Sequence, residues 1–448
     1  MVTKERAKVF RDPIYGYIEA SPEELKVISL PIFQRLRWVS QVAFCDLAYP
    51  SAKHTRFSHS LGVMHLCGLY ADHLAQFGLM EDHEELRRLL RLAGLLHDIG
   101  HWPFSHVAEP TFAEFVLKDE QGWEDSHMRW GQQIIRSPDF GISRIIGGES
   151  AEYVAALIGG QGEQLGLHPA LDHVLKGLFS ADRLDYLKRD AHHAGTTEYA
   201  IIDTQRIIDS TFVEGRRLQH LQKGLFALEG AILSYAYMYR ALYHHRVARG
   251  AACVFETALY HAFTDGRLGD KVDRYLEPST FSQFTDYKLL SLIADQGGEE
   301  ANGLIRALLA RRIPKCLLDY PDFDIYRGPL ANLGQKVRDY AKKRSIEQAV
   351  AQRLDGRRVY LDTPHFVPYI PPGDFTKEPL IAPSQDEALK AKLLSDRAPL
   401  LKALYDAFPI ITRVYIERGD AMPPKEYVME ILFEVWGEME PEAQKEEG

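Results

Sequence analysis

The sequence predicts a mainly α-helical fold with a short N-terminal β-hairpin and a small α+β lobe in its C-terminal part. Three patterns lead to this prediction. β-favouring residues flank a turn signal near the start, helical spacing of apolar residues dominates from Ser21 to about residue 310, and apolar β-branched runs follow. The 448 residues allow one large domain and a smaller one, and 46% apolar with 26% charged residues is typical of a globular protein.

Local signals predict the first elements. The segment "VFRDPIYGYIEA" places an Asp-Pro pair and Gly16 between β-favouring residues, which indicates a hairpin. In the "SPEE" that follows, Ser21 has the position of an N-cap, Pro22 that of the first helical residue and Glu24 that of the acid in a capping box. Longer helices are predicted over residues 84–99, 151–158 and 225–265.

The segments after residue 310 have a different composition. "RRVYLDTPHFVPYIPP" predicts a strand that leads into an extended proline-rich loop, and "ITRVYIERG" predicts a second strand. Between them, "SQDEALKAKLLSDRAPLLKALYDAF" predicts a helix. We therefore expect a core over residues 1–310, an α+β lobe over 311–436 and an acidic disordered tail over 437–448.

The charge and composition restrict the partners. The formal net charge of −10 argues against nucleic acid as a partner and favours a small anionic ligand in a local basic pocket. No apolar run reaches the roughly 18 residues of a membrane span, and the first residues lack the apolar segment of a signal peptide. Four separated cysteines without a CxxC pair are typical of reduced thiols. The expectation is a cytoplasmic protein without a membrane partner.

The stretch "LLHDIGHWPFSH" carries the strongest chemical signal. His97 and Asp98 stand at the end of an apolar helix, where Gly100 and Pro103 turn the chain. A buried aspartate beside a buried histidine is costly unless a cation neutralises the pair, and both side chains are ligands of divalent metals. For this dipeptide alone, a structural role stays open as an alternative, in which Asp98 lies at a capped helix end and His97 is a hydrogen-bonded residue of the core. Further ligands are available in "HTRFSHSLGVMHL" and "FSADRLDYLKRDA".

Seven segments in the same order resemble the HD-domain phosphohydrolases, and within them the deoxynucleoside triphosphate triphosphohydrolases. The resemblance covers roughly residues 8–320. It implies an HD-domain helical core whose motif region lies at about residues 50–190. It also implies metal-dependent hydrolysis of deoxynucleoside triphosphates to deoxynucleoside and inorganic triphosphate. The segments are "RDPIYGYIE", "PIFQRLRWVSQ", "HTRFSHSLGVMHL", "LAGLLHDIGHWPFSH", "SHMRW", "SADRLDYLKRDAHHAG" and "RRIPKCLLD".

The resemblance assigns metal ligation to four residues, which are His59, His97, Asp98 and Asp182. Two imidazoles and two carboxylates suit one divalent transition metal, and iron, manganese, zinc and nickel are all candidates. Such a metal polarises a phosphoryl oxygen and can activate a water molecule. Magnesium is a candidate for a second ion that is bound to the phosphates.

The resemblance also implies the residues of proton transfer. His127 is the implied general acid toward the 5′ oxygen, and Glu109 is the implied carboxylate that orients it. His101 and His106 are implied to face the phosphates. The family usually has a glutamate directly after the general acid, whereas this chain has Met128.

Further residues are implied to bind the substrate. Arg56 matches the residue that grips the phosphates, and its planar guanidinium suits bidentate binding. Gln41 and Val42 match a pair that faces the sugar, where an apolar side chain under C2′ rejects a 2′-hydroxyl. The other implied contacts are Arg183 with the phosphates, Tyr186 and Asp190 with the sugar, and His245 and Arg246 at the phosphate end of the pocket.

Family members are typically tetramers with nucleotide effector sites at subunit contacts, so the resemblance implies a homo-oligomer, either a dimer or a tetramer. The matching segment, "SLPIFQRLR", retains Gln34 and Arg37. Ser29 stands where the family has an acidic residue that reads guanine, and a serine cannot accept two base-edge hydrogen bonds as a carboxylate does. A nucleotide effector is therefore expected without a strict requirement for a guanine nucleotide.

Two other functions stay open at this point. An HD-type nucleotidase or phosphodiesterase would act on another nucleotide or on a nucleic-acid end. A nucleotide-sensing module would retain the fold without catalysis, although four intact and mutually dependent metal ligands argue against that reading.

Overall fold

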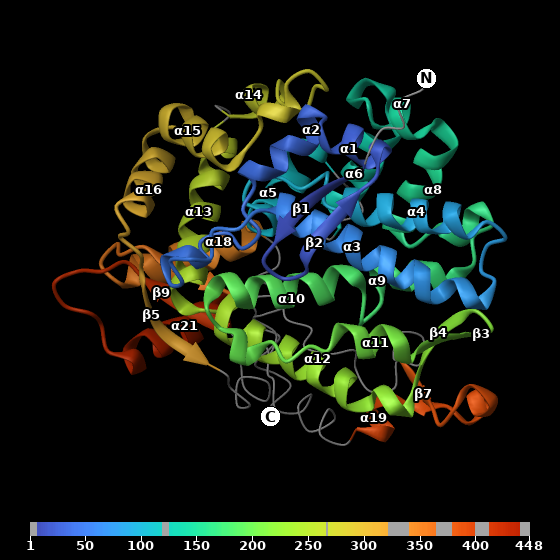
Figure 1. Cartoon of the computed structure of the whole chain (residues 1–448). Coiled ribbons are helices and arrows are strands. Elements are labelled where there is room, and N and C mark those ends of the chain that lie inside the picture. Colours follow the sequence, from blue (N-terminus) through green and yellow to red (C-terminus); the bar gives the residue numbers. More distant parts are fainter. Residues whose placement is uncertain are drawn as a thin grey trace.

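The computed structural model describes residues 7–118, 125–265, 268–320, 340–363, 379–398 and 412–439. The protein is mostly helical, with a hairpin at its N-terminus and small sheets in the C-terminal region, as the sequence predicts (Figure 1). Within these residues, no helix is both long enough and apolar enough to cross a membrane.

The N-terminal hairpin and the capping box form as predicted. The Ser21 hydroxyl accepts from the amide of Glu24 at 3.2 Å, and the Glu24 carboxylate accepts from the amide of Ser21 at 2.8 Å. The same carboxylate binds Arg91 of α4 (His83–Leu96) at 2.6 and 2.8 Å, which attaches this segment to the core. The first elements are β1 (Lys8–Asp12), β2 (Gly16–Ala20) and α1 (Pro22–Ile28).

Three helices, α3, α4 and α10, form the centre of the fold, and α3 packs against the other two (Figure 1). Two glycines allow the close approach. A side chain on Gly62 of α3 would meet Asp185 of α10 at 1.9 Å, and one on Gly94 of α4 would meet the Cys67 sulfur of α3 at 2.7 Å. The bounds of the other two helices are Arg56–Leu74 for α3 and Ala181–Ala194 for α10.

The other helices of residues 31–309 surround this centre. The prediction of one continuous helix over 225–265 is wrong in its middle. A π-helical turn covers Tyr239–Tyr243, and His245 then caps the start of a new helix. The remaining helices are α2 (Pro31–Gln34), α5 (Glu109–Phe112), α6 (Ser126–Arg136), α7 (Ile142–Ile146), α8 (Gly148–Gly159), α9 (Asp172–Lys176), α11 (Thr204–Ser210), α12 (Leu225–Met238), α13 (Arg246–Thr264), α14 (Gly269–Asp273), α15 (Asp286–Gln296) and α16 (Glu299–Leu309).

A second hairpin interrupts the region that the sequence predicts as helical. β3 (Thr211–Glu214) and β4 (Arg217–Leu221) turn at Gly215, whose φ of +58° glycine adopts without strain. β4 also pairs in parallel with β7 (Leu380–Ala382), and β8 (Lys392–Leu393) completes the sheet. The local pattern does not reveal this sheet, because half of it comes from a segment about 160 residues further along the chain.

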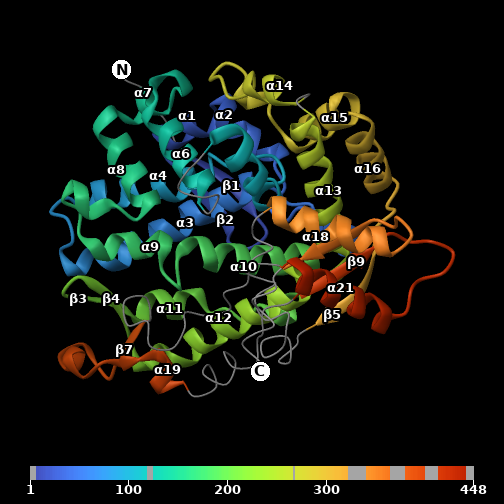
Figure 2. The same ribbon diagram turned by 180° about the vertical axis from the view of Figure 1, so that it is seen from behind.

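The predicted C-terminal strands form a second sheet with its own small core. β6 (Val359–Asp362) and β9 (Thr412–Ile416) lie where expected, and β5 (Lys315–Tyr320) completes an antiparallel sheet in the order β5-β9-β6. The helices α18 (Tyr340–Arg353) and α21 (Lys425–Met439) lie beside this sheet (Figure 2). Apolar residues of the sheet and of both helices form one buried cluster.

Other C-terminal predictions have mixed outcomes. The helix prediction over 384–408 is wrong in its described part, because a 3₁₀ segment, Gln385–Lys390, lies between β7 and β8 and α19 spans only Leu394–Arg397. Its remainder and most of the proline-rich loop lie outside the described residues. Of the expected disordered tail, residues 437–439 complete α21, and residues 440–448 lie outside the described part. The domain division at residue 310 stays a prediction.

Gly100 sets the distance between the end of α4 and helix α6. A Cβ atom on it would lie 2.2 Å from the carbonyl oxygen of His127 and 2.3 Å from the amide of Gly131. We predict that Gly100→Ala lowers the free energy of unfolding in urea by about 1–3 kcal/mol through overpacking. Gly303→Ala in α16 is the matched control, since nothing lies within 4 Å of its Cβ position. Equal effects of the two substitutions would contradict the tight contact at Gly100.

Candidate active site

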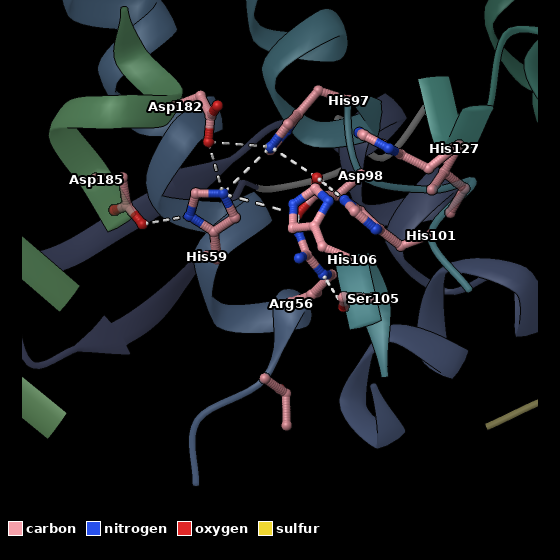
Figure 3. A network of polar contacts seen from close by, with 12 residues as sticks. Arg56, His59, His97, Asp98, His101, Ser105, His106, His127, Asp182 and Asp185 are labelled. Atoms are coloured by element: carbon pink, nitrogen blue, oxygen red, sulfur yellow. Dashed lines mark hydrogen bonds and ion pairs between the residues drawn. The ribbon is translucent and has the colours of Figure 1, made fainter. Parts of the chain in front are cut away.

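Four side chains from three helical elements converge on one point (Figure 3). His59 lies in the first turn of α3, His97 and Asp98 follow the end of α4, and Asp182 lies in the first turn of α10. The Nε2 atoms of His59 and His97 are 3.2 Å apart, and Asp182 Oδ1 is 3.0 and 3.6 Å from them. Asp98 Oδ1 lies 3.2 Å from His97 Nε2. The four residues that the resemblance implies as metal ligands are thus brought together.

The orientation of the two imidazoles fits a metal ion. His97 Nδ1 donates to the carbonyl of Gly94 at 2.8 Å, and His59 Nδ1 donates to Asp185 at 2.8 Å. Each ring therefore directs Nε2 toward the other ring. If both rings are neutral, the lone pairs of the two Nε2 atoms face and repel each other. A divalent cation among two nitrogens and two carboxylates removes this conflict, so the donor set fits a metal centre.

The electrostatics of these groups also favours a cation. Burial lowers the pKa of His59, but hydrogen bonds to Asp182 and Asp185 outweigh it and raise the pKa to about 10. Burial raises the pKa of Asp182, while His59 and His97 hold that pKa far below its usual range. The carboxylate therefore stays ionised, and a proton on His59 competes with a metal for the same position.

A chain of buried charges supports His59 from behind. Both oxygens of Asp185 accept from Arg189 at 2.9 Å, and Arg189 also binds Asp12 of the N-terminal hairpin at 2.8 Å. Arg189 and Asp185 are fully buried. The sequence offers Asp185 only as one of several candidate ligands and assigns nothing to Arg189, although their i,i+4 spacing on α10 is the signal that could have found this pair.

Three further histidines lie beside the metal centre, and Glu109 orients two of them. Its Oε1 accepts from the amide of His127 at 2.9 Å and from His127 Nδ1 at 2.6 Å, while its Oε2 accepts from His106 Nδ1 at 2.9 Å. Burial raises the pKa of Glu109, but His127 and His106 hold that pKa well below its usual range. Glu109 therefore remains a carboxylate, and Nε2 of His127 is the nitrogen left for a ligand.

His101 has a different environment. Its Nε2 lies 3.2 Å from Asp98 Oδ1, and its buried Nδ1 has no partner among the described residues. Burial and the charges of Arg56 and His127 hold its pKa well below the usual range, so the ring is neutral. The ring stacks on His127 with centroids 3.9 Å apart and planes at 14°. Lone pairs of stacked rings run parallel and do not converge, so these histidines suit hydrogen bonds to a ligand better than a second metal ion.

The metal centre opens into a cavity of about 600 Å³, a size that is typical of small-molecule sites. On α10, Tyr186 and Asp190 also line the cavity, and because they follow Asp182 by four and eight positions they share its helix face. Besides His97, Asp98, Asp182 and the three histidines, the predicted residues that line the cavity are Arg56, Gln41, Val42, Tyr186 and Asp190.

Arg56 lines the cavity but is already engaged with the protein. Its Nη1 donates to Asp98 Oδ2 at 2.6 Å, and its Nε donates to the hydroxyl of Ser105 at 2.7 Å. The guanidinium is buried. Its geometry therefore fixes the orientation of one metal-centre carboxylate.

Three of the residues that are implied to bind the substrate do not line the cavity. Arg183 follows Asp182 by one position, which turns it roughly 100° around the helix, and its guanidinium lies 4.9 Å from the ring centroid of Tyr235. His245 caps the start of α13, and the side chain of Arg246 is 65% exposed. The prediction that these three side chains face the pocket is wrong, because helix phase directs them elsewhere.

The cavity wall contains residues that the sequence analysis missed. Near the start of α13, His244 and Arg249 line the cavity in place of their predicted neighbours. A predicted helix break at residue 244 would have revealed them, because a new helix that begins there directs a different set of positions toward the cavity. Other missed lining residues are Tyr239, Tyr243, Glu256, Lys176, Lys343 and Asp362.

The predicted effector residues lie outside the cavity wall. Gln34 donates to the carbonyl of Ile28 at 2.7 Å and accepts from Arg37 Nε at 2.8 Å, while the Arg37 guanidinium lies 3.5 Å from the ring centroid of Phe57. The Ser29 hydroxyl donates to a carbonyl of its own helix at 2.7 Å. All these contacts lie within one chain, and the effector site stays a prediction.

Two family models match the chain. Residues 56–187 match the HD domain, and residues 202–370 match the HD associated region. The first range contains all four candidate metal ligands and the three neighbouring histidines.

Known proteins resemble the chain in sequence and in structure. A protein of Dictyostelium discoideum named deoxynucleoside triphosphate triphosphohydrolase SAMHD1 homolog is 28% identical over 288 residues, which are 63% of this chain and 54% of that protein. An uncharacterized protein of Methanocaldococcus jannaschii is 31% identical over 325 residues, which are 71% and 61% of the two chains. This chain therefore spans little more than half the length of these relatives. A solved structure of a hypothetical protein from Aquifex aeolicus has a TM-score of 0.70 and 26% identity, and covers 95% of this chain and 100% of its own.

Asp182 allows a clean test of the metal centre, since its side chain is 36% exposed and its removal leaves no fully buried charge unpaired. We predict that Asp182→Ala lowers manganese affinity at least tenfold, measured as metal content after equilibrium dialysis. Asp270→Ala, at an exposed position of α14, is the control, and the melting temperature of each variant checks folding. Full retention of the metal in folded Asp182→Ala would refute the assignment.

Proposed function

Because the chain belongs to the HD-domain family, we propose that it hydrolyses deoxynucleoside triphosphates to deoxynucleosides and inorganic triphosphate with one bound divalent metal. One observation carries this proposal. A donor set that fits a metal ion lies on the same cavity wall as His127, whose proton-donating nitrogen is oriented by buried Glu109. A metal and a positioned proton donor are what cleavage of a phosphoester bond requires.

The metal, when bound by His59, His97, Asp98 and Asp182, supplies a Lewis acid for a phosphoryl oxygen and an activated water. Arg56 holds Asp98 in place and presents its remaining guanidinium edge at the cavity wall. We assign the phosphates to this side of the cavity, since the N–H groups on the remaining edge of the planar guanidinium can donate to phosphate oxygens.

Proton transfer falls to His127. Glu109 accepts a hydrogen bond from His127 Nδ1, which fixes the orientation of the ring and directs Nε2 to the leaving group. Nε2 then carries the proton that passes to the 5′ oxygen as the bond to phosphorus breaks. The same carboxylate accepts from His106, so one buried group orients both rings despite Met128 in the next position.

The sugar is assigned to the wall formed by Gln41, Val42 and Tyr186. Asp190 is held beside them by Tyr243 at 2.6 Å and by His54 at 2.7 Å. Val42 is mostly buried, and an apolar side chain beneath C2′ leaves a ribose hydroxyl without a partner. These contacts support a deoxyribose preference.

The products distinguish this function from the two alternatives. We expect the manganese-loaded protein to release deoxynucleoside and inorganic triphosphate from at least one deoxynucleoside triphosphate, as separated by ion-exchange chromatography. Release of a monophosphate would indicate a nucleotidase or phosphodiesterase instead, and retained nucleotide without turnover would indicate a sensing module. Asp98→Ala should remove both the metal and the turnover, and activity that survives this change would refute the mechanism.

We also infer a cytoplasmic homo-oligomer, a dimer or tetramer, with a nucleotide effector near Gln34 and Arg37. Three of the four cysteines are buried and all four are unpaired, which supports a reducing compartment. Because Ser29 uses its hydroxyl within its own helix, it offers no carboxylate for a guanine edge.

This chemistry predicts weak control by guanine nucleotides. Adding dGTP should change the rate of dATP hydrolysis less than tenfold, measured as deoxyadenosine released per minute. An enzyme that is inactive alone and switched on only by dGTP would contradict this prediction.

A further inference from the structure

The cationic side chains on the cavity wall differ in whether they are free to bind an anionic ligand. Four described lining residues have basic side chains of lysine or arginine, namely Arg56, Lys176, Arg249 and Lys343. Three of them are paired with carboxylates. Arg56 binds Asp98 at 2.6 Å, Arg249 binds Asp362 at 2.5 and 3.1 Å, and Lys343 lies 3.4 Å from Glu256.

Lys176 is the exception among these four. Lys176 ends α9, six residues before Asp182, and forms no ion pair with any described residue. Its ammonium instead contacts the sulfur of Met128, which directly follows His127. Desolvation lowers the pKa of the Lys176 ammonium, and the nearby carboxylates of Asp125 and Asp182 oppose this effect. The ammonium therefore stands close to the metal centre and to the proposed proton donor.

We propose that Lys176 binds the terminal phosphates of the substrate, and that Met128 keeps its ammonium available for them. The inference rests on the proposed triphosphate substrate. It assigns a positioning residue to the part of the cavity where the sequence analysis expected Arg183, whose guanidinium lies on Tyr235 instead.

Charge balance supports this assignment. A nucleoside triphosphate brings three to four negative charges into a cavity whose wall already contains the carboxylates of Asp98, Asp125 and Asp182. A divalent metal compensates for Asp98 and Asp182, which leaves Arg56, held beside Asp98, as a single positive charge against the three to four charges of the phosphates. The β- and γ-phosphates therefore require a cation that is not already paired, and Lys176 meets this condition.

Met128 explains why Lys176 remains unpaired. A thioether sulfur is a weak, uncharged acceptor, so contact with it leaves the ammonium charge uncompensated. A glutamate in this position would lie against the same ammonium and form an ion pair. The phosphates would then compete with a fixed carboxylate for Lys176, at a cost in affinity.

The test measures binding of inorganic triphosphate to the manganese-loaded protein by isothermal titration calorimetry. We expect Lys176→Gln to raise the Kd about tenfold, as loss of one charge-assisted hydrogen bond does, and Lys176→Arg to stay within about threefold of the unmodified protein. Met128→Glu should weaken binding, whereas Met128→Leu should not. Lys223→Gln, at an exposed position outside the cavity, is the matched control.

A deoxynucleoside monophosphate serves as the second probe, because it lacks the terminal phosphates. Its Kd should be the same with and without Lys176→Gln, and in turnover assays this variant should raise KM much more than it changes kcat. Equal weakening of both probes would indicate a merely structural role and overturn the proposal, as would unchanged triphosphate binding. If the unmodified protein releases no triphosphate from any nucleotide, the proposed function fails, while the binding experiment still decides the role of Lys176.

Discussion

The site depends on one electrostatic constraint, which is that two carboxylates and two imidazole nitrogens share a space of a few ångströms. Asp98 and Asp182 stay ionised there, and His59 and His97 direct Nε2 toward one another because Asp185 and a backbone carbonyl hold their Nδ1 atoms. Only a cation stabilises this arrangement, whether a proton or a metal. The fold brings the four groups together by placing them at helix ends, where even adjacent residues such as His97 and Asp98 can reach the same point.

The same constraint explains why distant parts of the chain are tied to the centre. The carboxylate that orients His59 is itself neutralised by Arg189, and Arg189 is shared with Asp12 in the N-terminal hairpin. A buried ion pair of this kind adds little net stability compared with apolar packing, but removal of one partner leaves a buried charge. The hairpin is therefore part of the support of the metal centre, although it contributes no ligand.

The sequence predicted the parts of this protein that depend on local signals. The capping box at Ser21, the hairpin and the end of the helix at His97 all follow from residues within a few positions of each other. The metal set was implied by resemblance and not by spacing, since His59 and Asp182 are 123 positions apart. Arg183, His245 and Arg246 miss the cavity for a shared reason, which is helix phase: each lies within a few positions of a lining residue, yet one position turns a side chain by roughly 100°. The sheet that joins β4 to β7 depends on long-range pairing and leaves no local signal.

The C-terminal segments matter to the site through charge as well as packing. Asp362 of β6 and Lys343 of α18 line the cavity and pair with Arg249 and Glu256, which lie two turns apart on α13. These two pairs hold the far wall in place and leave it nearly neutral toward a ligand. The proposed metal and the unpaired ammonium of Lys176 then place the remaining positive charge on the metal side, next to His127. An anionic ligand that enters the cavity is thus attracted toward the end where the proposed metal ligands and the proposed proton donor lie, because the fold has already paired the cations of the far wall.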